Sequence, residues 1–253
     1  MKNLTIFTAS AAKPNIIVNP ANAADRMELP AGWSISADNP EDIIHGFSQL
    51  KIKKEYKLRG YQYFSGRNGN GVVWAIPAEV ELPNPDLCDQ LDDYFLSPPK
   101  PQFALDDFMG AIDGDRSPLS YLQAAIALHE LYEFGAIWHG CSWGQDRILP
   151  YTDDYREEMR SDIDERDPGI EDYLNFVHPW DELKEIPDIL NPHFFYKNGK
   201  PVVIFYTVND IGYYKLNRYI HTFNKESYIQ KVKREEIGSG PGELFSETKL
   251  SRL

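Results

Sequence analysis

One segment of the sequence, from Ser117 to Trp143, is apolar on nearly every side of the long helix that it predicts. Ser117 is a favourable N-cap residue, and Pro118 suits the first helical position. With about 100° of rotation per residue, apolar side chains cover most of the helix, and only a strip that holds Gln123 and Glu130 is polar. A helix with so little polar surface is expected to lie inside its protein, covered by other elements.

Two ionisable residues, His129 and Glu133, flank the polar strip one helical turn apart. Side chains at positions i and i+4 share a helix face, so this pair could form an ion pair, share a metal or act as an acid with its orienting partner. The run HELYE lacks the second histidine of the HExxH zinc motif, and no metal site is expected. The simpler interpretation is a buried histidine hydrogen-bonded to glutamate, because buried polar groups need partners.

The five residues from Gly140 to Gly144, GCSWG, resemble the G-x-S-x-G nucleophile elbow of serine hydrolases of the α/β-hydrolase class. The resemblance implies Ser142 as a nucleophile. The elbow needs a strand before it and a helix after it, whereas a helix is predicted before this segment. A tight turn bounded by glycines at the helix end is therefore the favoured interpretation.

Composition and pattern together predict a single α+β domain over residues 1–253, with a possible lobe boundary near residues 97–102, where prolines cluster. The runs YKLRGYQYF and VVWAI around GRNGNG predict a β-hairpin. The C-terminal third predicts a four-stranded antiparallel meander that turns at Asn198-Gly199, with Tyr219 and His221 on the opposite face from Leu216 and Ile220 and with one of the two faces exposed to water. The fold class is thus antiparallel sheets with a buried central helix. Short strands at 4–9 and 16–18 and a helix over 86–95 are also expected.

The two cysteines, Cys88 and Cys141, show no CxxC or ligand spacing, which argues against a disulfide framework and against structural zinc. No run of 18 apolar residues is present, so no membrane span is expected. The interrupted apolar stretch near the N-terminus is a poor signal peptide. We therefore expect a soluble cytoplasmic protein without a cofactor.

The net charge of −13 is unevenly distributed along the chain. Residues 151–190 hold 14 acidic and 4 basic side chains, whereas residues 51–67 hold 6 basic side chains and one acidic one, and residues 209–234 are also rich in lysine and arginine. If the two basic stretches shared a sheet face, an acidic protein would still present a basic surface to an anion. The alternative is that these cations are solvent-facing residues of ordinary strands.

The basic hairpin also contains tyrosines and a phenylalanine, which could stack on bases while cations neutralise phosphates. The candidate binding residues are Lys53, Lys57, Arg59 and Arg67. Against nucleic acid stand the acidic net charge and the ordinary role of aromatic residues in sheet packing.

Three functions remain open from the sequence. The favoured one is a noncatalytic binding or interaction protein whose partner is a protein or an anionic ligand, because charge is segregated and no catalytic motif is complete. The second is a hydrolase with its site near the end of the central helix, at His129, Glu133 and Ser142. The third is nucleic-acid binding through the basic hairpin.

Overall fold

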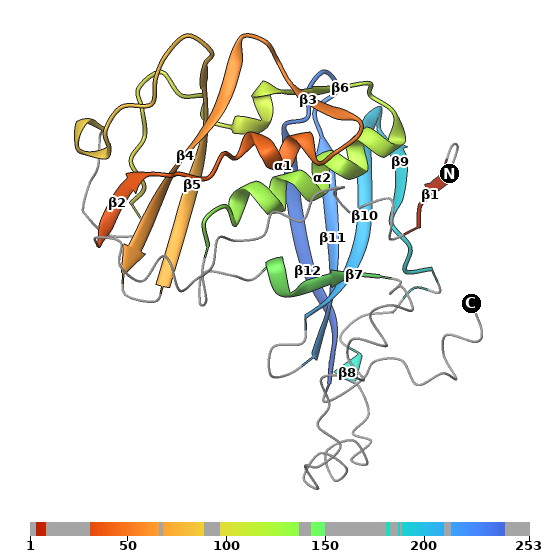
Figure 1. The fold of residues 1–253 in the computed structure, drawn as a ribbon. Helices are drawn as coiled ribbons and strands as arrows, with labels where there is room; N and C mark the ends of the chain where they lie inside the picture. Colours follow the sequence, from red (N-terminus) through yellow and green to blue (C-terminus); the bar gives the residue numbers. More distant parts are fainter. Residues whose placement is uncertain are drawn as a thin grey trace, which may run out of the picture.

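The computed structural model of the chain describes residues 4–8, 31–65, 68–88, 97–136, 143–149, 181–182, 187, 189–209 and 214–240. In this part of the chain the strands pair in antiparallel fashion and form three sheets around one long helix, α2 (Pro118–Tyr132). Figure 1 shows α2 lying across the largest sheet, with a smaller sheet beside the C-terminal end of the helix. The predicted α+β class with a central helix and a C-terminal meander is confirmed.

The start of α2 is the one that the sequence predicts, but its end comes earlier. The Ser117 hydroxyl accepts a hydrogen bond from the backbone N–H of Ser120, and Pro118 occupies the first turn. The helix ends at Tyr132, and Gly135 follows with a φ of +72°, a conformation that favours glycine. The prediction of a helix continuing towards Trp143 is therefore wrong.

The polar strip of α2 is not open to solvent as predicted: Gln123 is buried, Glu130 is partly buried, and both have partners in neighbouring segments. The Gln123 side chain accepts a hydrogen bond from the backbone N–H of Gln49 and donates one to the Ser48 hydroxyl. Glu130 accepts a hydrogen bond from the indole of Trp143. The exposed position is instead Tyr132, at 63%. Neighbouring segments thus cover the strip because it supplies the hydrogen-bond partners that their own polar groups need.

The largest sheet has the strand order β1-β9-β10-β11-β12-β8, and β7 also pairs with β10. Its strands are β1 (Thr5–Ile6), β7 (Asp146–Ile148), β8 (Asp181–Glu182), β9 (His193–Lys197), β10 (Lys200–Asn209), β11 (Tyr214–Phe223) and β12 (Gln230–Gly240). The β9–β10 turn places Asn198 and Gly199 at positive φ, as the Asn-Gly signal predicts. The predicted meander is confirmed.

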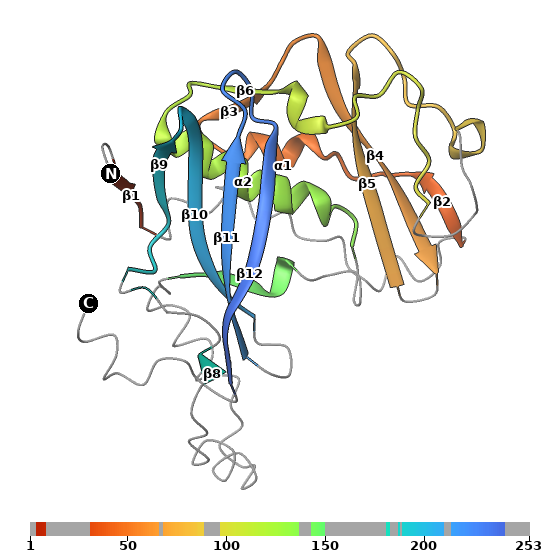
Figure 2. The same ribbon diagram turned by 180° about the vertical axis from the view of Figure 1, so that it is seen from behind.

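One face of this sheet packs on α2. Figure 2 views the meander from the opposite side, where the strands lie in front of the helix. The residues that face α2 include Phe205, Tyr219 and His221, all of them buried. The sequence leaves open which face is wet, and the structure shows that the face with Tyr219 and His221 covers the helix.

The second sheet has the order β2-β4-β5 and contains the predicted hairpin. Its strands are β2 (Gly32–Ile35), β4 (Tyr56–Ser65) and β5 (Asn68–Pro77). Gly60 and Gly71 form a glycine patch on the inner face of this sheet, against Phe134 just beyond α2. The missing side chains let the backbone after α2 approach the sheet closely.

Two shorter elements complete the cover of α2. Helix α1 (Glu41–His45) contributes Ile43 and Ile44 to the core, and it begins where Asn39-Pro40 predicts a helix start. Strand β3 (Leu50–Ile52) pairs with β6 (Ile112–Gly114). The core that contains Ile44 extends without interruption through α2 to Phe205 on β10.

The connector at 97–105 lies along the smaller sheet. The Trp74 indole donates to the carbonyl of Pro99, and the backbone N–H of Leu105 donates to the carbonyl of Ala75. The expected helix at 86–95 is represented by a 3-10 turn, Pro85–Leu87, while residues 89–96 lie outside the described residues, as do the expected strand at 16–18 and the acidic residues 151–180.

No helix in the described part of the chain has the length and apolar character needed to cross a membrane.

We expect Gly71→Ala to lower the free energy of unfolding by about 1–3 kcal/mol, because overpacking a closed interior forces backbone shifts. The new Cβ would overlap the carbonyl oxygen of Phe134. Gly110→Ala is the control, because its Cβ would come no closer than 3.4 Å to a methyl group of Leu105. Urea unfolding measures the stability of both variants. Equal midpoints would show that the glycine patch does not determine how closely the backbone after α2 approaches the sheet.

Candidate functional site

The predicted site residue His129 meets a second histidine. Its Nε2 atom lies 3.2 Å from Nε2 of His221, which projects from β11 towards α2. On its other side, His221 has Nδ1 at 2.7 Å from Oε1 of Gln230, the first residue of β12. The Gln230 amide in turn donates to the carbonyl of Ala124 in α2. A chain of polar groups thus joins β12, β11 and both ends of the helical segment 124–129.

The hydrogen-bond partners fix the proton positions in this chain. The carbonyl of Ala124 only accepts, so the Gln230 amide nitrogen faces it and Oε1 faces His221. His221 must then donate from Nδ1, which leaves Nε2 of the neutral ring as an acceptor. His129 therefore donates from Nε2 and is neutral with its proton on that atom.

Aromatic rings enclose the two imidazoles. The Trp143 ring stacks on His129 with centroids 4.2 Å apart, and Tyr219 meets His129 edge-on at 4.9 Å. Phe205 stacks on His221 at 5.1 Å. These rings replace water around the pair and leave few groups that would solvate a positive charge.

The enclosure keeps both histidines neutral near pH 7. Burial, together with the nearby His221 and Arg234, lowers the pKa of His129 to about 2. Burial also lowers the pKa of His221 to about 4, against the opposing effect of the hydrogen bond that its Nδ1 donates to Gln230. A general base works best when its pKa lies near the working pH, so His129 is a weak one at neutrality.

Glu133 binds the segment that follows α2. Its carboxylate accepts hydrogen bonds from the backbone N–H groups of Trp143 and Gly144, the latter at 2.8 Å. Trp143 begins a 3-10 turn, and a carboxylate at the first N–H groups of such a turn is favourable. Glu130 receives the Trp143 indole, and burial raises the pKa of this carboxyl, with the charge of Glu133 adding to the rise. These contacts hold the stacked Trp143 ring in place.

A buried carboxylate, Asp146, lies beyond the histidine pair. Its side chain is 1% exposed and accepts hydrogen bonds from the side chains of Thr207, Asn209 and Tyr219. The guanidinium of Arg234 is 4.0 Å away and stacks over the Tyr219 ring. Burial raises the pKa of Tyr219, and the hydrogen bond to Asp146 and its charge raise it further. Asp146 thus joins β7 to β10 and β11.

The sequence interpretation missed His221, Gln230, Trp143 and Asp146 as parts of this site. Trp143 and Asp146 lie in or next to the GCSWG segment, whereas His221 and Gln230 come from strands far along the chain. The alternation on β11 places Tyr219 and His221 on one face and is visible in the sequence, but it does not say which face is buried.

Part of the predicted hydrolase site, Ser142, lies outside the described residues, as do His139 and Cys141. The hydrolase therefore stays a prediction. In the part of the chain that the structure describes, no three side chains of His, Cys, Asp or Glu gather as metal ligands.

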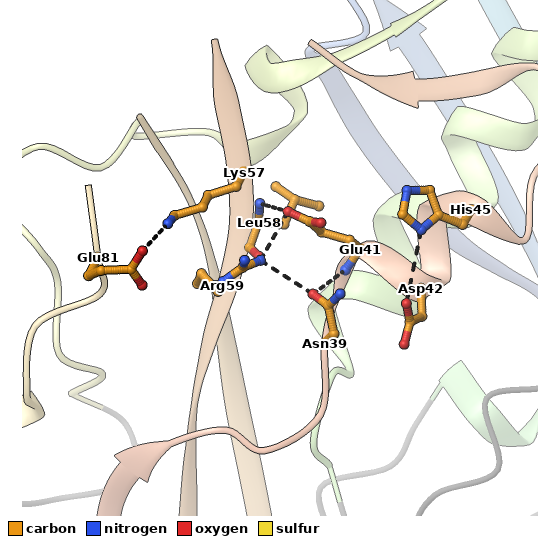
Figure 3. Close-up of polar contacts among 8 residues, drawn as sticks. All are labelled: Asn39, Glu41, Asp42, His45, Lys57, Leu58, Arg59 and Glu81. Carbon is orange, nitrogen blue, oxygen red and sulfur yellow. Dashed lines mark hydrogen bonds and ion pairs between the residues drawn. The ribbon is translucent and has the colours of Figure 1, made fainter. Parts of the chain in front are cut away.

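The basic hairpin lies on the smaller sheet, and Figure 3 shows two of its cations engaged with nearby acids. Lys57 donates to Glu81 at 2.7 Å, and this contact lowers the pKa of the Glu81 carboxyl. The Lys57 side chain is only 12% exposed, whereas that of Glu81 is 88% exposed. The pair thus presents its carboxylate to the solvent.

Arg59 has partners at the start of α1. Its guanidinium donates to Glu41 at 3.0 Å, and the same Glu41 oxygen accepts the backbone N–H of Leu58 (Figure 3). The third candidate, Lys53, donates to the carbonyl of Gly110 at 2.6 Å, and Arg67 lies outside the described residues. The three described candidates are therefore engaged by the protein itself.

The second basic stretch, residues 209–234, lies in the largest sheet, whereas the basic hairpin lies in the second sheet. The two stretches therefore do not share one sheet face. The cations of the second stretch on β12 are Lys231, Lys233 and Arg234. Residues 231–234 are all exposed, in contrast to Lys57 and Arg59. Lys51 and Lys54 of the first stretch and Lys215 on β11 are also exposed, but β12 presents three cations within four consecutive exposed residues.

Comparisons of this chain with protein-family models, with curated proteins and with solved structures found no match.

We expect the histidine pair to make the protein less stable in acid. Both folded-state pKa values lie below the ordinary value of 6.5, so the unfolded state binds more protons once the pH falls below about 6.5. This contribution to stability is complete above about pH 6.5 and is lost as the pH falls towards 4, by a few kcal/mol. Urea unfolding at pH 7.5 and pH 5 measures the loss. His129→Phe should remove about half of it, and an unchanged loss in this variant would contradict the assignment.

We expect Glu41→Ala to lower the free energy of unfolding by about 1–3 kcal/mol, because it leaves the N–H of Leu58 and the charge of Arg59 without their acceptor. Glu81→Ala is the matched control beside the same hairpin, and because the Glu81 carboxylate is 88% exposed, this variant should have the smaller effect. Thermal or urea unfolding compares the two, and a larger effect of Glu81→Ala would refute the assigned roles.

Proposed function

We propose that this protein is a noncatalytic interaction protein that binds another polypeptide along the outer edge of β12. The observation that carries the proposal is a row of four exposed residues, Lys231 to Arg234, on a strand with one described neighbour at these positions. The partner adds itself to the sheet as a further strand, with its backbone paired to the backbone of β12.

The pairing of β12 defines the edge. The strand runs over 11 residues and pairs with β11 along its length, from Phe223 opposite Gln230 to Tyr214 opposite Gly240. On its other side β8 pairs only with Gly238 and Ser239. Figure 2 shows β12 as the last strand of the meander on the side away from β9. No other described strand pairs with residues 231–234.

An edge strand presents N–H and C=O groups that can pair with another chain. Lysines on such edges commonly protect a protein from pairing with a copy of itself, because the like charges repel. The same cations favour a partner of opposite charge. Lys231, Lys233 and Arg234 therefore restrict pairing at β12 to suitable partners without closing the edge.

The interior of the protein holds this edge in a fixed position. Gln230 begins β12 and is bonded to His221 and to the carbonyl of Ala124. Arg234 lies over the Tyr219 ring, close to the buried Asp146. A binding strand that is rigid before association loses less conformational entropy on binding. In this proposal the histidine pair is a support for β12.

A photo-cross-linking amino acid at Val232, which is 41% exposed, tests the proposal in the native cells of the protein. We expect a defined cross-linked product that disappears when Lys231→Glu and Lys233→Glu are added, because the charge at the edge is reversed. The same cross-linker at Tyr196, exposed on β9 at the other side of the sheet, is the control. Identical products from both positions, or none from Val232, would refute the β12 edge as the binding surface.

A further inference from the structure

We infer that the segment bound by β12 is extended and acidic, with carboxylates at alternate positions. This inference rests on the proposed function and names the chemistry of its partner. Two observations support it. The register shows on which face of the sheet each exposed side chain of β12 lies, and nearby carboxylates neutralise the β12 cations only in part.

The register of β11 with β12 assigns these faces. Lys231 and Lys233 lie opposite Thr222 and Ile220, on the face away from α2. Val232 and Arg234 lie opposite His221 and Tyr219, on the face towards α2. Side chains directly opposite in an antiparallel pair share a face. Each side chain of an added strand would therefore lie on the same face as the β12 residue opposite it.

The two faces of β12 therefore favour different types of side chain on the two faces of the added strand. Opposite Lys231 and Lys233 this strand needs two carboxylates at positions i and i+2, because opposite charges across a pair are favourable. Opposite Val232 it needs an apolar side chain, whereas Arg234 already lies beside the buried Asp146 and over the Tyr219 ring. The predicted recognition pattern opposite residues 231 to 233 is therefore acid, apolar, acid.

Nearby carboxylates neutralise the cations of β12 only in part. Glu235 is shared between Arg218, at 2.6 Å, and Lys233, at 3.0 Å. Lys231 has no ion-pair partner within the described residues, and its side chain is exposed. One carboxylate thus serves two cations beside a third, and this part of the edge stays positive.

The range of electrostatic forces favours a short acidic segment over a long polyanion. Charges interact over about 8 Å at physiological salt, so a few carboxylates on β12 experience mainly the cations of the edge. A nucleic acid extends beyond this distance and meets the rest of a protein whose net charge is −13. A protein segment also supplies the backbone N–H and C=O groups that a strand edge pairs with.

Fluorescence anisotropy with synthetic peptides tests the inference on the full chain. The probe is a labelled eight-residue peptide with glutamate at every second position and valine or threonine between. We expect it to bind, and we expect Lys231→Glu with Lys233→Glu to raise its Kd about tenfold or more. Lys197→Glu with Lys200→Glu is the matched control, because these exposed lysines face each other across the β9–β10 hairpin of the same sheet and give the same change in charge. The control should leave Kd unchanged.

Two further peptides separate charge from strand addition. A peptide with glutamine in place of glutamate should bind at least about tenfold more weakly, and equal affinity would refute the acidic partner while leaving strand addition intact. A peptide with alternate backbone N-methyl groups keeps its charges but loses donors, so its undiminished binding would refute strand addition itself. Tighter binding of duplex DNA than of the acidic peptide, lost in the same β12 variant, would overturn the inference in favour of a nucleic acid. Absence of peptide binding in a protein that still cross-links at Val232 would refute only the acidic class.

Discussion

The need of buried polar groups for partners shapes the centre of this protein. α2 is enclosed by apolar side chains, yet it carries Gln123, His129 and Glu130 into that interior. Each of them fixes one neighbouring segment: Gln123 holds the backbone after α1, His129 meets β11, and Glu130 receives the Trp143 indole. A buried donor or acceptor left without a partner costs about 1–3 kcal/mol, so alternative placements of these segments are disfavoured. Hydrophobic burial supplies most of the stabilisation, whereas these polar contacts determine which packing is adopted.

The same constraint explains why two histidines face each other in the core. A single buried imidazole would need both a donor and an acceptor nearby, and the pair supplies one for each ring. Gln230 completes the arrangement, because its amide is oriented by the carbonyl of Ala124 and presents oxygen to His221. Neutral rings stack readily on Trp143 and Phe205 without the cost of burying charge. The enclosure that stabilises the pair therefore makes it a poor proton acceptor and a good structural connection between α2 and β12.

Local signals made much of the fold predictable from the sequence. Ser117 and Pro118 locate the start of α2, and Asn198-Gly199 locates a hairpin turn, because caps and turns depend on a few adjacent residues. The sequence does not reveal which face of β11 is buried, since both faces alternate equally well and the choice depends on where α2 lies. The sequence singled out His129 and Glu133, which the structure places on α2 and at its C-cap. Their partners could not be identified, because His221 lies 92 residues away and any of many polar groups satisfies the same requirement.

The two basic stretches show why composition alone does not locate a binding surface. In the hairpin, Lys57 pairs with Glu81 from the loop after β5, and Arg59 pairs with Glu41 at the start of α1. These cations therefore stabilise the fold. On β12 the ladder itself places Lys231 and Lys233 at the limit of the sheet, where fewer acids lie within reach. The difference comes from the neighbouring segments: α1 and the loop after β5 bring acids to Lys57 and Arg59, whereas β12 has only β11 as a described strand neighbour at residues 231–234. An edge strand presents its charges together with unpaired backbone groups. In the proposed function, that combination of charge and backbone on β12 supplies both the affinity for a polypeptide and the means to select one.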